Sequence, residues 1–230
     1  MNADTYANFD TRSHADPHGA QPVRTLGPSL SDARAAVIIL HGRGADANDI
    51  LPLADEIDVP HVRWLAPDAA NNAWYPDRFM QPLANNEPWL TSALALVHRT
   101  VEQVISGGVP IERIVLAGFS QGACLALEYA ARNAQRYGGV IAFAGGLIGP
   151  DDTPRDYAGS FSGTPVFIGV GDQDFHIPVS RSTESAEVFT RLGAQVDLRV
   201  YKGLPHTIVD DQIQAARVIL TAAAREDNRS

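Results

Sequence analysis

Short apolar runs alternate with helix-like segments along most of this chain, and this alternation limits the fold more than any other feature. The first five runs are almost continuously apolar, as strands buried on both faces of a sheet are. The last run alternates apolar and polar residues, as an edge strand would. Strand and helix repeated in this order predict an α/β fold with a mostly parallel central sheet and helices on both faces. The runs are residues 36–40, 62–67, 114–117, 140–143, 165–170 and 196–201.

The segments between these runs carry helical signals. Pro88 can open a helix whose apolar residues share one face, and Gly107 and Gly108 can end it. Further helices are predicted over residues 46–57, 123–131, 182–192 and 210–224.

The length and the first residues indicate the domain organisation. A chain of 230 residues fits one α/β domain. Residues 1–33 are rich in Asp, Asn, Gly, Pro and His without a clear period, which predicts an extended lead-in before a domain over residues 34–230. His14 and His18 lie in this lead-in without a further ligand cluster, so we expect no metal site there.

Charge and cysteine content disfavour several classes of partner. A formal net charge of -9 repels phosphate backbones, so we expect no nucleic-acid binding. We find no signal peptide or membrane-spanning run, and expect no integral membrane association. The chain has one cysteine and so no intramolecular disulfide, which agrees with a cytoplasmic location.

The segment Gly118-Phe119-Ser120-Gln121-Gly122 lies between a predicted strand and a predicted helix. This Gly-x-Ser-x-Gly pattern is weak alone, but the strand before it and the helix after it are the context that presents a nucleophilic serine on a sharp turn. Gly118 and Gly122 supply room on the crowded face of such a turn. We therefore predict that Ser120 is a nucleophile.

A serine nucleophile needs a general base and a carboxylate that orients it. On a hydrolase sheet the chain order is Ser, then Asp or Glu, then His, so His206, directly after the last strand, is the predicted base. His176 lies beside Ile177 and Pro178 and is expected to pack or to sit at the rim. Asp172 and Asp174 both follow the fifth strand, and physical reasoning alone leaves the choice of acid open.

Two backbone N–H groups are expected to form an oxyanion hole. One belongs to Gln121, directly after the serine, and the other to Arg43, in the glycine-containing loop after the first core strand. We expect the Arg43 side chain to be solvated or salt-bridged. His41 in the same loop is expected to be a structural hydrogen-bonding residue.

Residues 68–87 form the longest irregular stretch inside the predicted core. A long loop that carries aromatic side chains is uncommon unless it covers or lines something. Its candidate substrate-pocket residues are Trp74, Tyr75, Phe79 and Met80, with packing in the core as the alternative.

Taken together, four motifs resemble the phospholipase/carboxylesterase family, whose members include acyl-protein thioesterases and small bacterial carboxylesterases. The resemblance implies a compact α/β-hydrolase without a metal or organic cofactor, and often a homodimer. The family's acid lies four residues before a proline, which here implies Asp174, with Asp172 as the fallback. Thioesterases of the family usually carry Leu where this chain has Arg43, so the bacterial carboxylesterase branch is favoured. The motifs are residues 41–46 (His-Gly-Arg-Gly-Ala-Asp), 118–123 (Gly-Phe-Ser-Gln-Gly-Ala), 171–178 (Gly-Asp-Gln-Asp-Phe-His-Ile-Pro) and 203–206 (Gly-Leu-Pro-His).

The resulting functional hypothesis is a serine carboxylesterase that hydrolyses small to medium acyl esters through an acyl-enzyme intermediate. An acyl-protein thioesterase or lysophospholipase is the alternative within the same chemistry. A catalytically silent binding module on a hydrolase fold is the alternative from another class; such modules generally lose a member of the catalytic set, and this chain has all three.

Overall fold

A seven-stranded sheet forms the centre of the molecule in the computed structural model, which describes residues 16–225. The strand order is β1-β3-β2-β4-β5-β6-β7, and every neighbouring pair is parallel except β1 and β3. The strands are β1 (Val23–Leu26), β2 (Ala35–Leu40), β3 (Val62–Pro67), β4 (Ile114–Phe119), β5 (Gly139–Phe143), β6 (Pro165–Gly171) and β7 (Gln195–Tyr201).

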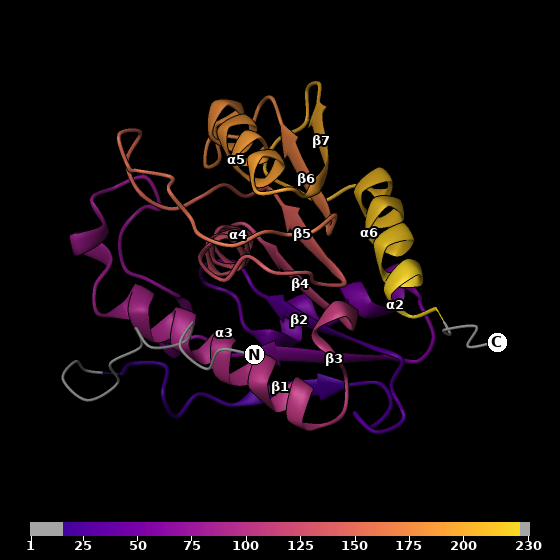
Figure 1. Cartoon of the computed structure of the whole chain (residues 1–230). Helices are drawn as coiled ribbons and strands as arrows, with labels where there is room; N and C mark the ends of the chain where they lie inside the picture. Colours follow the sequence, from indigo (N-terminus) through magenta and orange to yellow (C-terminus); the bar gives the residue numbers. More distant parts are fainter. Residues whose placement is uncertain (1–15, 226–230) are drawn as a thin grey trace.

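Helices cover both faces of this sheet (Figure 1). The helices α3, α4 and α5 pack on one face, and α2 and α6 cover the other. Two separate apolar clusters, one on each side of the sheet, fill the space between the layers. The helices are α1 (Ala47–Ile50), α2 (Leu53–Ile57), α3 (Trp89–Ser106), α4 (Gln121–Arg132), α5 (Val179–Arg191) and α6 (Asp210–Ala223), with 3₁₀ turns η2 (Ala70–Asn72), η3 (Leu83–Asn86) and η4 (Ile111–Arg113).

The predicted α/β architecture is confirmed, including the position of β7 at an edge of the sheet. The segment 46–57 differs from the single helix expected there, because it is divided into α1 and α2. Pro52 stands at the division as the N-cap of α2. A proline has no N–H to donate within a helix, which explains the break. Within residues 16–225, no helix combines the length and the apolar character needed to cross a membrane.

The segment 1–33 also differs from the expected lead-in where the structure describes it. The strand β1 lies inside this segment and pairs antiparallel with β3, so the sheet begins at Val23 rather than after residue 33. His14 lies outside the described residues.

Two buried histidines attach the loop after β3, the irregular stretch over residues 68–87, to the rest of the fold. His18 is fully buried, and its Nδ1 accepts a hydrogen bond from the N–H of Ala70 (3.0 Å). His41 is buried as well, and its Nε2 accepts from the N–H of Ala69 (3.0 Å). The other ring nitrogen of each histidine faces a backbone carbonyl, that of Trp74 for His18 and that of Gly42 for His41. Both rings are therefore held as neutral tautomers, and His41 has the structural role expected for it.

Acidification should destabilise this arrangement. Burial lowers the pKa of His18 and of His41 below the ordinary value of 6.5, because the charged rings would be desolvated. As the pH falls through about 6.5, the unfolded chain therefore binds protons before the folded one, and the free energy of unfolding drops by up to about 1.4 kcal/mol per pH unit for each histidine. Urea unfolding at pH 7.5, 6.5 and 5.5 measures the slope.

The variants His18→Asn and His41→Gln provide the control, because each side-chain oxygen can accept the same backbone N–H without titrating. In each variant the urea midpoint of unfolding should change less with pH than in the wild type. If the midpoint depends on pH as strongly in both variants as in the wild type, the two histidines are not the groups responsible.

Candidate active site

Ser120 stands at the sharp turn between β4 and α4, at the carboxyl end of a central strand. Its φ is 55° and its ψ is −118°, a left-handed conformation that is strained for a residue with a side chain. A Cβ on Gly118 would overlap the backbone of Gly122, and a Cβ on Gly122 would overlap the carbonyl of Leu40. Both glycines are thus required by close backbone contacts, and these contacts hold the serine at the end of the sheet.

A continuous chain of hydrogen bonds joins three side chains from distant parts of the sequence. The Nε2 of His206 lies 2.8 Å from the Oγ of Ser120, and its Nδ1 lies 2.6 Å from the Oδ2 of Asp174. The Asp174 carboxylate is fully buried, whereas the His206 side chain is 20% exposed. With the Nδ1 proton donated to the carboxylate, Nε2 is free to accept the serine proton.

The loop after β6 fixes this carboxylate. The second oxygen of Asp174, Oδ1, accepts the N–H groups of His176 (2.8 Å) and Ile177 (2.9 Å). The side chain of Ile177 is buried and anchors the loop. His176 lies at the rim, as expected, with its ring centroid 4.8 Å from that of His206.

Asp172, the alternative acid, has a different task. Its Oδ1 accepts the N–H of Gly203 at 2.6 Å, in the segment that leads from β7 to His206. Among the described residues it has no hydrogen bond to His206, so it fixes the backbone near the histidine rather than the imidazole itself. Sequence reasoning from the residues could not separate the two aspartates; in the structure Asp174 contacts the His206 ring and Asp172 contacts the Gly203 N–H.

The two predicted oxyanion residues lie on either side of Ser120. Gln121 is the first residue of α4, where a backbone N–H has no acceptor within the helix. Arg43 directly follows Gly42, and a Cβ built on Gly42 would lie 3.5 Å from the Cβ of Ser120. The loop after β2 therefore passes close to the serine.

Arg43 is exposed, which agrees with the expected solvation of its side chain, but the side chain also has backbone partners that were not expected. Its guanidinium donates to three backbone carbonyls, those of Pro76 (2.8 Å), Tyr75 (2.9 Å) and Asp77 (2.6 Å). A planar group with donors in a fixed fork suits this set of acceptors. Arg43 thus attaches the irregular loop after β3 to the loop that follows β2.

Gln121 attaches the same loop from the other side, and no local sequence pattern predicts this attachment. Its side-chain oxygen accepts the N–H of Trp74 (2.9 Å), and its amide nitrogen donates to the carbonyl of Tyr75 (2.8 Å). The two residues proposed to bind an oxyanion through their backbone therefore both hold residues 74–77 through their side chains.

The four candidate pocket residues lie mostly inside the protein. Trp74 and Tyr75 are 0% and 1% exposed, and Phe79 is 8% exposed. All three belong to the apolar cluster beneath α3 and α4, and the indole N–H of Trp74 donates to the carbonyl of His41. Packing in the core, rather than an open pocket, accounts for these three; Met80 is partly exposed and packs against the same cluster.

Within residues 16–225, no group of three or more His, Cys, Asp or Glu side chains is arranged to hold a metal ion. The chemical groups of the site are the Ser120 hydroxyl, the His206 imidazole and the Asp174 carboxylate, joined in that order by hydrogen bonds.

A mostly parallel sheet with a serine on a strand–helix turn is the architecture of the α/β-hydrolases, and comparisons with known proteins agree. The sequence model of the phospholipase/carboxylesterase family matches residues 28–223. A phospholipase/carboxylesterase from Dyadobacter fermentans DSM 18053 has a similar crystal structure, with 47% sequence identity and a TM-score of 0.84 over 90% of this chain and 97% of that chain.

More distant relatives extend the likeness. Acyl-protein thioesterase 1 of Saccharomyces cerevisiae is 28% identical over 207 residues, 80% of this chain and 91% of the relative. The Bacillus cereus carboxylesterase, at 18% identity, shares the fold with a TM-score of 0.70 over 89% of this chain and 95% of that chain. The chain belongs to the phospholipase/carboxylesterase family, and the resemblance seen in the sequence is confirmed.

Removing the Arg43 guanidinium should impair the site more than removing an exposed arginine side chain from the loop after β3 that Arg43 holds. The variant Arg43→Leu loses three charge-assisted hydrogen bonds to residues 75–77, which frees the loop that packs against Gln121. We expect kcat/KM for p-nitrophenyl butyrate to fall by about tenfold or more. The loss should be in kcat, because the predicted role of the Arg43 N–H is to bind an oxyanion, which forms in the transition state.

Arg78→Leu is the matched control. Arg78 lies in the same loop, is exposed and carries the same charge. It should keep activity within about twofold of the wild type. Equal losses in the two variants would show that charge alone, and not the attachment of the loop, explains the effect.

Proposed function

We propose that the protein is a serine carboxylesterase that hydrolyses small to medium acyl esters through an acyl-enzyme intermediate. The observation that carries this proposal is the hydrogen-bonded order Asp174–His206–Ser120, with the serine on a strained turn at the end of the sheet. A nucleophile, a base and a group that orients the base are the minimum for acyl transfer by a serine.

In the first step, the Ser120 Oγ attacks the ester carbonyl while His206 Nε2 takes the hydroxyl proton. The backbone N–H groups of Arg43 and Gln121 bind the oxygen that becomes negative. Collapse of the tetrahedral intermediate breaks the carbon–oxygen bond of the ester, and His206 gives its proton to the departing alcohol. Asp174 keeps Nδ1 protonated throughout and stabilises the imidazolium.

In the second step, water replaces the alcohol. His206 takes a proton from the water as it attacks the acyl carbon of the Ser120 ester, and the same two N–H groups bind the oxyanion. Breakdown of this intermediate returns the proton to the Ser120 Oγ and releases the carboxylic acid. No redox step or cofactor is required by this sequence of bond changes.

One feature supports small acyl groups and another supports esters over thioesters. The aromatic side chains of Trp74 and Tyr75 are packed in the core, so they offer no exposed apolar surface to a long acyl chain. The relative with 47% identity is described as a phospholipase/carboxylesterase, whereas the thioesterase relative is 28% identical. As part of the same proposal, the enzyme works in the cytoplasm, where the single buried Cys124 stays a thiol.

Replacing the nucleophile tests the proposal directly. Ser120→Ala should lower kcat for p-nitrophenyl acetate and butyrate by roughly 10³-fold or more, because no other group can form the acyl-enzyme. A fluorophosphonate should label the wild type at Ser120 and leave the variant unlabelled.

The control variant Ser180→Ala removes an exposed hydroxyl from the second residue of α5 and should behave as the wild type. Absence of labelling and of turnover in the wild type would favour a silent binding module. Faster hydrolysis of an acyl thioester than of the matching oxygen ester would favour the thioesterase alternative.

Two isosteric substitutions test the acid. Asp174→Asn should lower kcat by several orders of magnitude, because the amide cannot hold the productive His206 tautomer. Asp172→Asn keeps a side-chain oxygen for the Gly203 N–H and should lose less than about tenfold. Steady-state kinetics of the two variants on p-nitrophenyl butyrate measures the loss of kcat. Equal losses of kcat, or a larger loss in Asp172→Asn, would contradict Asp174 as the acid.

A further inference from the structure

Phe119, the residue directly before Ser120, is in contact with two different parts of the candidate active site. It is the last residue of β4, and its side chain is partly buried. Its ring packs against both apolar clusters, the one beneath α3 and α4 and the one on the other side of the sheet. The ring is therefore held in place by both layers of the fold.

The loop after β2 passes close to this ring. A Cβ built on Gly42 would lie 3.3 Å from the Cδ1 of Phe119. That distance is shorter than the separation of about 3.5–4.0 Å at which two carbon atoms attract best. Gly42 directly precedes Arg43, the proposed oxyanion donor. The missing side chain at Gly42 therefore leaves room for the phenyl ring beside the loop that carries this donor.

The imidazole of His206 also lies against the Phe119 ring. Their centroids are 4.8 Å apart and their planes are inclined by 34°, which is closer to a stacked than to an edge-on arrangement. His176 contacts the same imidazole, again with a centroid distance of 4.8 Å, but it is an exposed residue at the rim. Of the two neighbouring rings, Phe119 is the one that the core holds.

Hydrogen bonds alone hold this imidazole incompletely during the proposed reaction. The torsion that turns an imidazole about the bond to its Cβ has a broad energy profile. In the free enzyme both ring nitrogens of His206 are held, Nδ1 by Asp174 and Nε2 by Ser120. In the acyl-enzyme the Ser120 Oγ carries the acyl group and no proton, so the neutral Nε2 has lost its donor.

We propose that Phe119 is a positioning residue that holds the His206 imidazole in place, above all while the acyl-enzyme is hydrolysed. The inference rests on the proposed function, because it concerns the second step of that reaction. The phenyl ring limits rotation of the imidazole at the stage when the bond to Ser120 is missing. It also lies within the roughly 6 Å at which an aromatic ring stabilises a cation, so the contact stays favourable when His206 takes up a proton.

The contact of the ring with Gly42 predicts a different pattern of loss. An oxyanion forms in acylation and in deacylation alike, so a displaced Arg43 N–H would slow both steps to a similar extent. A loosely held imidazole slows deacylation more, because that step lacks the hydrogen bond between Ser120 and His206. Separate rates for the two steps therefore distinguish positioning of the base from positioning of the oxyanion donor.

Phe119→Leu provides the test, because leucine keeps an apolar side chain and removes the flat ring. After rapid mixing with excess p-nitrophenyl butyrate, the burst of p-nitrophenol measures acylation and the steady rate that follows measures deacylation. We expect deacylation to slow by about tenfold and acylation by less than about threefold. The value of kcat should therefore fall more than that of kcat/KM, and KM should fall as well.

Two further variants show whether the ring and its place matter. Phe119→Tyr keeps the ring and should stay within about threefold of the wild type in both steps. Phe189→Leu is the matched control, since Phe189 contacts Phe161 at the same centroid distance of 4.8 Å. Both of these rings are fully buried, so the control should lower the urea midpoint of unfolding and keep both rates within about twofold.

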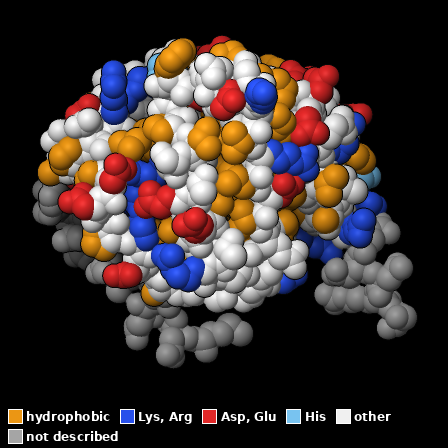
Figure 2. Space-filling model, turned by 90° about the horizontal axis from the view of Figure 1, so that it is seen from above, with side chains coloured by type: hydrophobic (Ala, Val, Ile, Leu, Met, Phe, Trp, Pro, Cys, Tyr) orange, Lys and Arg blue, Asp and Glu red, His pale blue; other side chains and the backbone are white. Residues whose placement is uncertain are grey.

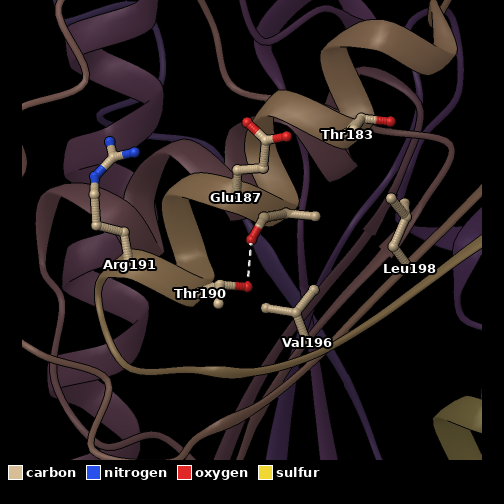
Figure 3. Close-up of a pocket in the computed structure, with 7 residues that line it drawn as sticks. Thr183, Glu187, Thr190, Arg191, Val196 and Leu198 are labelled. Atoms are coloured by element: carbon tan, nitrogen blue, oxygen red, sulfur yellow. Dashed lines mark hydrogen bonds between the residues drawn. The ribbon is translucent and has the colours of Figure 1, made fainter.

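The control lies in a part of the molecule that shares no residue with the site. Thr190 and Arg191, the two residues after Phe189 in α5, line a groove together with Val196 and Leu198 of β7 (Figure 3). None of the residues that line this groove belongs to the candidate site. Seen from above, the region of α5 and β7 carries hydrophobic side chains among acidic and basic ones (Figure 2). The control therefore measures the loss of a packed ring by itself.

Four results would overturn the inference. Equal slowing of both steps in Phe119→Leu would assign the effect to the oxyanion loop, and unchanged rates would show that the ring is not needed. A smaller burst at unchanged rates would show that the ring only stabilises the fold. Equal losses in Phe119→Leu and Phe119→Tyr would exclude the flat ring as the cause. A wild type without turnover and without fluorophosphonate labelling would instead remove the proposed function, and this inference with it.

Discussion

The structure depends first on the close contact between the start of α4 and the end of β2. Gly122 lies so near the carbonyl of Leu40 that a side chain cannot be placed there. This contact brings the amino end of α4 beside the loop that carries Arg43, and it places Ser120 between them. A strained turn of this kind costs roughly 1–3 kcal/mol. The burial of nearly all of α4 against the sheet offsets that cost, since eleven of its residues are buried.

The irregular loop after β3 is the second part of the site. Apolar packing alone does not explain its shape. Its backbone is held by four side chains from three places: His18 before β1, His41 and Arg43 after β2, and Gln121 at the start of α4. All of these bonds end on backbone N–H or C=O groups, which any sequence offers. The loop thus owes its shape to the residues around it, and two of these residues, Arg43 and Gln121, are also the ones whose backbone N–H groups we propose as oxyanion donors.

Local patterns were sufficient to predict the sheet and the positions of Ser120 and His206. The reason is topological, because the carboxyl ends of parallel strands meet at one edge of the sheet and collect residues that are far apart in the chain. The strand β1 was missed since it has four mostly exposed residues and no apolar period. The role of the Arg43 side chain was missed since its acceptors are backbone carbonyls more than 30 residues away. Trp74 and Tyr75 were candidates either for a pocket or for the core, because a loop sequence does not show which of its aromatic side chains turn inward.

The two edges of the sheet are built differently, and the difference bears on the site. The strand β1 is short, which is one way in which proteins protect an edge from pairing. The strand β7 is longer and pairs with β6 over its whole length in a regular register. The same strand leads directly into the turn at Gly203 that Asp172 holds, and then to His206. The edge strand β7 therefore leads directly to His206, the proposed base, and the position of that strand helps to place the imidazole at the end of the sheet.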